Sequence, residues 1–239
     1  NIQSIFQGQI DFMKLLTWNC NLNLAQKFQI LEPYNCDIFI IQECERLKTN
    51  FFPNYDYFWV GKNEKKGLGI LVTKSLKARI SHFNNQNLIY FLPLETELTN
   101  VLGVWAFNHR ASKFGRQFSG YTSYALSFYK KWLVQSNKFI LGGDLNNSVL
   151  WDKGDKQNNF LNIESFLQNL DYKSVYHNQF NEEYGYEKQP TFFHTKKEYK
   201  SYHIDFLFLK ALNAQRVELG SYSEWIKFSD HMPLICEVQ

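Results

Sequence analysis

The stretch Phe139-Ile-Leu-Gly-Gly-Asp-Leu-Asn-Asn147 shows the pattern on which the fold of this 239-residue chain depends. An apolar run leads into two glycines, and an aspartate and two amides follow directly. Apolar runs that end in Gly, Asp and Asn are typical of strands that stop at a turn. The stretch therefore predicts a strand over Phe139–Gly142 whose end presents Asp144 and Asn146 at the edge of a sheet.

Similar runs rich in β-branched and aromatic residues recur along the chain and predict further strands. Between them, apolar residues at helical spacing predict helices, most clearly over Asn159–Leu170, where five apolar side chains share one face. The predicted strands are Lys14–Trp18, Ile38–Ile41, Gly69–Val72, Val101–Phe107, Phe139–Gly142, Ile204–Leu209 and Leu234–Val238, and the predicted helices are Ala25–Leu31, Tyr121–Val134 and Asn159–Leu170.

The order of these elements favours a mixed α/β or α+β architecture, because the strands are connected both by helices and by turns. No repeat, low-complexity tract or Pro/Gly-rich linker divides the chain, and its length suits one large domain. Residues 1–12 precede Met13, which opens the first predicted strand, and are interpreted as a leader or an added remnant. A single domain is therefore predicted over residues 13–239.

The composition is that of an ordinary globular protein, with 44% hydrophobic, 21% charged and 18% aromatic residues. The formal charge of +3 permits a polyanionic partner without requiring one. The four cysteines form no CxxC pair and are interpreted as buried reduced thiols: Cys20, Cys36, Cys44 and Cys236. Without a membrane-spanning apolar run or a signal-peptide pattern, we expect a cytoplasmic protein with no membrane partner.

Polar residues gather where the predicted strands end or begin. The clusters are Asn19-Cys20-Asn21, Gln42-Glu43, Asp144-Leu145-Asn146, Tyr202-His203-Ile204-Asp205 and Ser229-Asp230-His231. Any one of them is explained as well by an ordinary turn or a solvated side chain. Because strand ends in an α/β sheet meet at one edge, five such clusters together predict a site there.

The residue types in these clusters suit phosphodiester chemistry. The oxygens of Glu43, Asp230 and Asn21 are ligands that magnesium or manganese prefers. Asp144 is placed to orient or deprotonate a water molecule, with Asn146 holding that water or a phosphate oxygen. Asp205 beside His231 would fix the imidazole and favour its protonated form, which stabilises a charged transition state.

The same segments, in the same order, resemble the endonuclease/exonuclease/phosphatase superfamily. The resemblance is carried by Leu16-Thr-Trp-Asn-Cys-Asn21, Ile41-Gln-Glu43, Gly143-Asp-Leu-Asn146, His203-Ile-Asp-Phe206 and Ser229-Asp-His231. It implies a DNase I-like catalytic domain, a four-layered α/β sandwich of two mixed sheets flanked by helices.

The resemblance also implies a role for each matching residue. Glu43 would bind the metal, which is Mg²⁺ or alternatively Mn²⁺, with Asn21 in a metal-site position and Asp230 nearby. Asn19 would orient Asp144, which activates the water. The remaining roles follow the same correspondence: Asn146 would contact phosphate or water, and Asp205 would pair with His231.

Within the superfamily, the chain looks most like the exonuclease III and abasic-endonuclease branch. Pro190-Thr-Phe-Phe193 and the following Tyr202-His203-Ile204 resemble the segments that form the sugar pocket of that branch. Phe192, Tyr202 and Ile204 are therefore candidate substrate-binding residues, and the alternative is that they are core residues.

One position departs from the family pattern. The strand Val101–Phe107 should end near a Tyr or His that touches the scissile phosphate, and this chain offers Phe107, Asn108 and His109. We assign the role to His109, with the register open by one or two residues. Three cations follow in a Gly- and Ser-containing loop and are either phosphate contacts or merely solvated charges: Arg110, Lys113 and Arg116.

Three functions remain open from the sequence. The first is a metal-dependent nuclease acting on DNA or RNA, with DNA preferred, abasic-site or exonuclease cleavage as subtypes, and no obligate protein partner. The second is a phosphatase or phosphodiesterase acting on a small phosphorylated molecule or a phospholipid. The third, a catalytically dead binding module, is disfavoured because the five residues that carry the proposed chemistry are all present: Glu43, Asp144, Asn146, Asp205 and His231.

Overall fold

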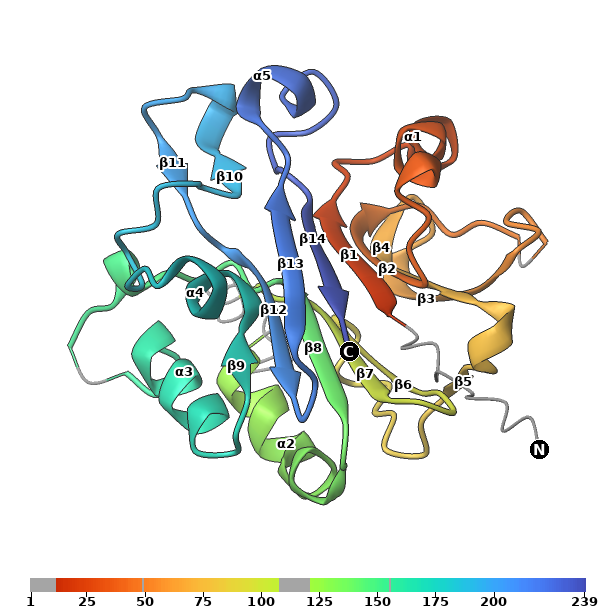
Figure 1. Ribbon diagram of the computed structural model, residues 1–239, viewed down its shortest axis with the longest axis horizontal. Helices are drawn as coiled ribbons and strands as arrows, with labels where there is room; N and C mark the ends of the chain where they lie inside the picture. The colour runs from red at the N-terminus through yellow and green to blue at the C-terminus, as the bar shows by residue number, and fades with distance from the viewer. Residues whose placement is uncertain (1–11, 49, 108–120, 155) are drawn as a thin grey trace, which may run out of the picture.

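The computed structural model describes residues 12–48, 50–107, 121–154 and 156–239. Two six-stranded mixed sheets lie face to face (Figure 1). The first sheet has the order β13-β14-β1-β2-β4-β3, and the second has the order β5-β6-β7-β8-β12-β9. This arrangement, with helices outside both sheets, confirms the predicted four-layered α/β sandwich.

The first sheet contains β1 (Met13–Asn19), β2 (Ile38–Cys44), β3 (Tyr55–Asn63), β4 (Lys66–Thr73), β13 (Ala214–Leu219) and β14 (Leu234–Val238). The second contains β5 (Arg79–Ile80), β6 (Phe91–Glu95), β7 (Asn100–Trp105), β8 (Phe139–Asp144), β9 (Lys173–Ser174) and β12 (Asp205–Lys210). A small third sheet pairs β10 (Phe192–Phe193) with β11 (Ser201–Tyr202).

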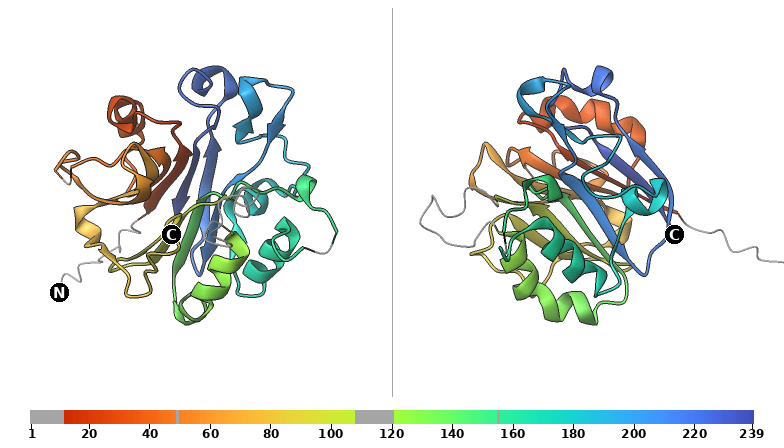
Figure 2. Two further views of the ribbon diagram at one scale, coloured as in Figure 1. Left: turned by 180° about the vertical axis from the view of Figure 1, so that it is seen from behind. Right: turned by 90° about the vertical axis from the view of Figure 1, so that its left-hand side faces the viewer.

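Helices cover the outer faces of the two large sheets. Side chains of α1 (Leu24–Leu31) and α5 (Tyr222–Trp225) pack on the first sheet. Those of α2 (Thr122–Gln135) and α3 (Phe160–Gln168) pack on the second (Figure 2). The remaining helix, α4 (Val175–Phe180), contacts β9, β12 and β13. No helix in the described part of the chain is long and apolar enough to cross a membrane.

The apolar runs of the central strands arise because both of their faces are buried. In β2, Ile38 and Ile40 face the core between the sheets, whereas Phe39 and Ile41 face the layer that contains α1. Each of these four side chains is at most 1% exposed. Alternation within a continuous apolar run is the signature of a sheet covered on both faces.

The four cysteines are free and buried, which confirms their interpretation as reduced core thiols. Burial raises the pKa of the Cys36, Cys44 and Cys236 thiols to about 12. Thiols with such pKa values are not nucleophiles at neutral pH, so they contribute packing and not chemistry.

Gly143 fixes the end of β8, directly before Asp144. Its φ is +138°, and a Cβ atom placed there would lie 1.9 Å from the carbonyl oxygen of Val104 on the neighbouring strand β7. Any side chain at this position would therefore push β7 and β8 apart. The strands would separate directly before Asp144, which pairs with Trp105 of β7.

Replacing Gly143 by alanine is expected to lower the free energy of unfolding by about 3 kcal/mol or more, since it combines backbone strain with a main-chain clash. Thermal unfolding measures this as a fall in Tm of roughly 6–12 °C for a chain of this size. Gly154→Ala is the matched control, because Gly154 also has a positive φ of 57° but open space around it. Equal losses of Tm in the two variants would contradict the clash argument.

Candidate active site

The polar strand ends converge on one cavity of about 690 Å³ at the edge of the two sheets. Parallel pairing of β1 with β2 brings Asn19 level with Gln42, and antiparallel pairing of β8 with β12 places Asp144 opposite Asp205. The cavity is lined by Asn19, Asn21, Glu43, Lys66, Trp105, Phe107, Asp144, Asn146, Trp151, Phe192, His194, Tyr202, Asp230 and His231.

Asp144 is 1% exposed and is held by amide donors on both of its oxygens. The side-chain amides of Asn19 and Asn146 each donate to Oδ2 at 3.0 Å. The backbone N–H of Asn146 donates to Oδ1 at 2.8 Å, and Asn146 itself adopts a left-handed φ of 46°. The carboxylate therefore has one fixed orientation, set by three donors from β1 and from the turn after β8.

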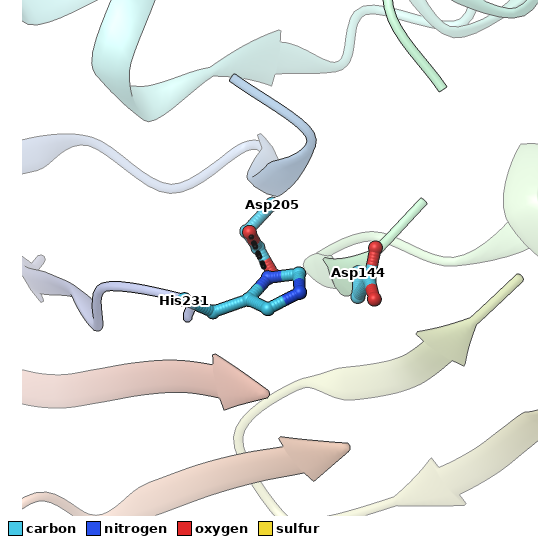
Figure 3. Close-up of side chains that lie close together, drawn as sticks. All are labelled: Asp144, Asp205 and His231. Atoms are coloured by element: carbon cyan, nitrogen blue, oxygen red, sulfur yellow. Dashed lines mark hydrogen bonds and ion pairs between the residues drawn. The ribbon is translucent and has the colours of Figure 1, made fainter. Parts of the chain in front are cut away.

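His231 and Asp205 form a buried pair beside Asp144. The Nδ1 atom of His231 lies 2.9 Å from Oδ2 of Asp205. Figure 3 shows the imidazole between the two carboxylates, with its other nitrogen turned toward Asp144. Among the described residues, each of these three side chains offers a possible ligand atom, and the atoms lie within 4.8 Å of one another.

The charges of this trio shift the pKa values of its members. Burial raises the pKa of Asp144 to about 7, and the adjacent Asp205 adds to that shift, while His231 opposes it. Burial alone would lower the pKa of His231, but the charge and hydrogen bond of Asp205 outweigh it and raise that pKa to about 9. At neutral pH the imidazole therefore carries a proton, and Asp144 is close to its titration midpoint.

The loop before β14 is tied to β1, which fixes His231. The hydroxyl of Ser229 donates to the carbonyl of Asn19 at 2.7 Å and accepts from the backbone N–H of His231 at 3.1 Å. The indole of Trp18 donates to the carbonyl of His231 at 2.9 Å. These buried bonds give the spacing between Ser229 and His231 a structural reason: the serine positions the histidine.

The three residues expected at the metal site line the same cavity. Glu43 lies at a bulge of β2, where its φ of 58° turns the side chain out of the regular strand pattern. Asn21 donates from Nδ2 to Oδ1 of Asp230 at 3.2 Å. Two carboxylates and an amide facing one open cavity are a donor set that suits a hydrated hard cation.

An ammonium group already lies on one of these carboxylates, which supports a cation position there. Nζ of Lys66, at the start of β4, is 2.7 Å from Oε2 of Glu43. This contact cannot be predicted from the sequence, because it depends on the register of β2 against β4 and on the bulge at Glu43.

Aromatic side chains form the wall of the cavity beside His231. The rings of Phe192 and His231 lie 4.6 Å apart, and those of Trp151 and Tyr202 lie 4.9 Å apart. Phe192 and Tyr202 therefore line the cavity, and their contact with a substrate stays a prediction. Ile204 is 0% exposed and does not line the cavity, so its side chain belongs to the core.

The strand β7 ends at Trp105, two residues earlier than expected, and Phe107 lines the cavity. His109, Arg110, Lys113 and Arg116 lie outside the described residues, so their expected phosphate contacts stay predictions. Five cavity residues received no role from the sequence: Lys66, Trp105, Phe107, Trp151 and His194. Each is an ordinary core or surface residue by sequence pattern, and only the tertiary structure brings it to the cavity.

Comparisons with known proteins identify the family of the chain. The profile of the "Endonuclease/Exonuclease/phosphatase family" matches residues 16–231, which is most of the chain. The chain belongs to this family. The matched range contains every polar cluster described above, from Asn19 to His231. No curated protein matches the sequence significantly.

Solved structures share the fold at low sequence identity. A 3'-5' exonuclease (NExo) from Neisseria meningitidis is 15% identical, with a TM-score of 0.70 over 94% of this chain and 98% of that chain. The AP endonuclease LMAP from Leishmania major is 12% identical, with a TM-score of 0.69 over 95% and 88%. TDP2 from Caenorhabditis elegans is 16% identical, with a TM-score of 0.63 over 95% and 74%. These likenesses establish the fold shared by the family members.

Proposed function

We propose that the protein is a divalent-metal-dependent phosphodiesterase that cleaves nucleic acid, with DNA preferred over RNA. The observation that carries the proposal is that His231, paired with Asp205, lies beside the amide-held Asp144 in the cavity that Glu43, Asn21 and Asp230 also line. The same cavity thus offers a base, an acid and a set of oxygen ligands.

Within this proposal, Asp144 accepts the proton of the attacking water. Its two oxygens already accept bonds from Asn19 and Asn146, which keep it oriented without removing its basicity. Its raised pKa makes it a stronger base than an exposed aspartate and still leaves a large ionised fraction at neutral pH. Asn146, which lines the cavity, is the candidate for a contact to the water or to a phosphoryl oxygen.

His231 is the candidate acid for the leaving group. Its Nδ1 is occupied by Asp205, so Nε2 is the nitrogen that can donate to the leaving oxygen. Asp205 is 0% exposed and lies against Nδ1 of the imidazole, where its charge and hydrogen bond raise the pKa of His231 and so favour the protonated form. The positive charge of His231 also offsets the negative charge that develops on the phosphoryl group.

Glu43, Asp230 and Asn21 would hold the metal, for which we propose Mg²⁺, with Mn²⁺ as a substitute. When bound, the ion would supply positive charge to the phosphoryl oxygens and help to orient the substrate. The buried Asp144–Asp205–His231 trio is less suited to a resident metal, since the Nδ1 of His231 and the Oδ2 of Asp205 already satisfy each other. We therefore assign proton transfer to the trio and cation binding to Glu43, Asp230 and Asn21.

Nucleic acid is favoured over a small phosphorylated molecule by the aromatic wall. Phe192, Trp151 and Tyr202 provide ring surfaces within the same cavity as the proposed chemistry, and bases and sugars pack on such surfaces. Two of the structural relatives are named as an exonuclease and an AP endonuclease, which supports cleavage next to an end or an abasic site.

The test is cleavage of labelled substrates with Mg²⁺, Mn²⁺ or EDTA. The panel contains single- and double-stranded DNA, an abasic-site duplex, RNA and an inositol polyphosphate. We expect a DNA substrate to be cut with Mg²⁺, cleavage to stop with EDTA, and activity to return when Mg²⁺ is added in excess. Phosphate release from the inositol polyphosphate alone would overturn the nucleic-acid assignment, and cleavage that persists in EDTA would overturn the metal dependence.

A further inference from the structure

Lys66 forms a contact that the proposed function does not use. Its Nζ lies 2.7 Å from Oε2 of Glu43 and 5.5 Å from the centre of the Trp105 ring, and all three residues line the cavity. The side chain of Lys66 is 41% exposed, and that of Glu43 is 19% exposed. The pair therefore lies at the opening of the cavity and is not locked into the core.

A second lysine near the site shows the difference between a fixed and a movable ammonium. Nζ of Lys27 donates to three backbone carbonyls, those of Cys20, Asn21 and Phe228. In the described part of the chain, Nζ of Lys66 contacts the carboxylate of Glu43 and the face of the Trp105 ring. Lys27 is thus anchored by the main chain, whereas Lys66 can leave Glu43 by rotating its own side chain.

The carboxylate that Lys66 neutralises is the one to which we assign cation binding. The other carboxylate, Asp230, accepts from the neutral amide of Asn21. A divalent ion bound to Glu43 would therefore meet an ammonium within a few ångströms, and two positive charges at that separation repel each other strongly. The ion and the ammonium compete for the same oxygens.

We propose that Lys66 is an exchangeable counter-ion of the metal site: its ammonium occupies Glu43 until a divalent cation displaces it, and it then binds a phosphoryl oxygen of the substrate. This inference rests on the proposed function. The flexible stem and the rotatable donors of lysine suit such an exchange. The face of Trp105 keeps the released ammonium inside the cavity, where the substrate phosphate lies.

The exchange couples metal binding to substrate binding. Metal alone must displace the ammonium from Glu43 without giving it a new anionic partner, which weakens the binding of the metal. A substrate phosphate gives the ammonium a new partner, so metal and substrate each strengthen the binding of the other by the same factor. Lys66 thereby acts as a substrate-binding residue that favours loading of the metal when substrate is present.

The first measurement is Mn²⁺ binding without substrate, by isothermal titration calorimetry, to the wild type, Lys66→Met and Lys65→Met. Methionine retains much of the apolar stem against Trp105. We expect Lys66→Met to bind Mn²⁺ about tenfold more tightly than the wild type, which corresponds to about 1.4 kcal/mol. Lys65 is exposed in the turn before β4, so Lys65→Met removes the same charge without removing the pair and should change the affinity by less than about twofold.

The second measurement repeats the titrations with thymidine monophosphate present. The nucleotide should increase Mn²⁺ affinity in the wild type and in Lys65→Met, and should increase it several-fold less in Lys66→Met. Equal Mn²⁺ affinities in all three proteins would overturn the competition, and an unchanged nucleotide effect in Lys66→Met would overturn the phosphate contact. Either result leaves the proposed nuclease standing, whereas a wild type that binds no Mn²⁺ with or without nucleotide would overturn both.

Discussion

Replacing Asp144 by asparagine is expected to lower kcat by about 10³-fold or more on any substrate that the protein cleaves, because the amide cannot accept the proton of the attacking water. The side chain keeps its size and its position between Asn19 and Asn146. The measurement is single-turnover cleavage at saturating metal and substrate, which isolates the chemical step. KM should change much less than kcat.

We expect the Asp144→Asn protein to stay folded, because the substitution has two effects on stability that oppose each other. Removing a carboxylate whose pKa is raised by burial relieves an unfavourable charge. Against this, asparagine has one acceptor oxygen, so it cannot accept from Asn19, from the side chain of Asn146 and from its backbone as Asp144 does. We expect the two effects to cancel to within about 1 kcal/mol, so that Tm changes by no more than about 2–4 °C.

The control for this experiment is Asp171→Asn. Asp171 is exposed, and its left-handed φ of 64° is one that asparagine also tolerates. This variant removes the same charge at a distance from the cavity and should cleave at the wild-type rate. Cleavage by Asp144→Asn within tenfold of the wild type would mean that another group activates the water and that the assignment of Asp144 is wrong.

The elements that the sequence predicts correctly are strands buried on both faces and helices that bury one apolar face. The predicted Leu234–Val238 matches β14 at both ends, and the three predicted helices begin and end within two residues of α1, α2 and α3. In these segments, the requirement for burial leaves a continuous or periodic apolar pattern. That pattern is readable without knowledge of the neighbouring elements.

The strands that escape prediction have weaker local patterns. The strand β13 (Ala-Gln-Arg-Val-Glu-Leu) lies at an edge of the first sheet and buries only Val217, so charged residues interrupt it. The strand β6 contains Pro93, which normally argues against a central strand. Pro93 is accommodated because the outer neighbour of β6 is β5, whose two residues pair only with Leu94 and Glu95.

The residues of the candidate site also fall into two groups, those that the sequence predicts and those that it does not. The residues at strand ends were predictable because sheet topology brings such ends together, as with Asp144 and Asp205. Lys66 was not, since its contact with Glu43 depends on one bulge in β2. Trp151 precedes a loop and meets Tyr202 only in the folded chain. Local pattern therefore predicts the groups to which we assign the chemistry better than the groups that shape the cavity around them.

Replacing His231 by glutamine is expected to lower kcat by about 10²–10⁴-fold, since glutamine can hydrogen-bond to Asp205 but cannot deliver a proton or carry a charge. The His231→Ala variant should lose as much activity and also about 3–5 kcal/mol of stability, because it leaves Asp205 buried without a cationic partner. Glutamine is therefore the cleaner test of chemistry. His82→Gln, an exposed site 75% open to solvent, is the matched control and should retain full activity.

The leaving group and the pH distinguish the acid role of His231 from a structural one. The raised pKa means that His231 is protonated below about pH 9, so wild-type activity should fall as pH rises through that value. His231→Gln has no such group, so its activity should not show this fall at high pH (the basic limb of the pH–activity profile). A nitrophenyl ester of thymidine monophosphate releases a stable phenolate that needs little protonation, so the loss of activity in His231→Gln should shrink by at least about tenfold on that substrate. An equal loss on both substrates, with the basic limb retained, would show that His231 supports the site without donating the proton.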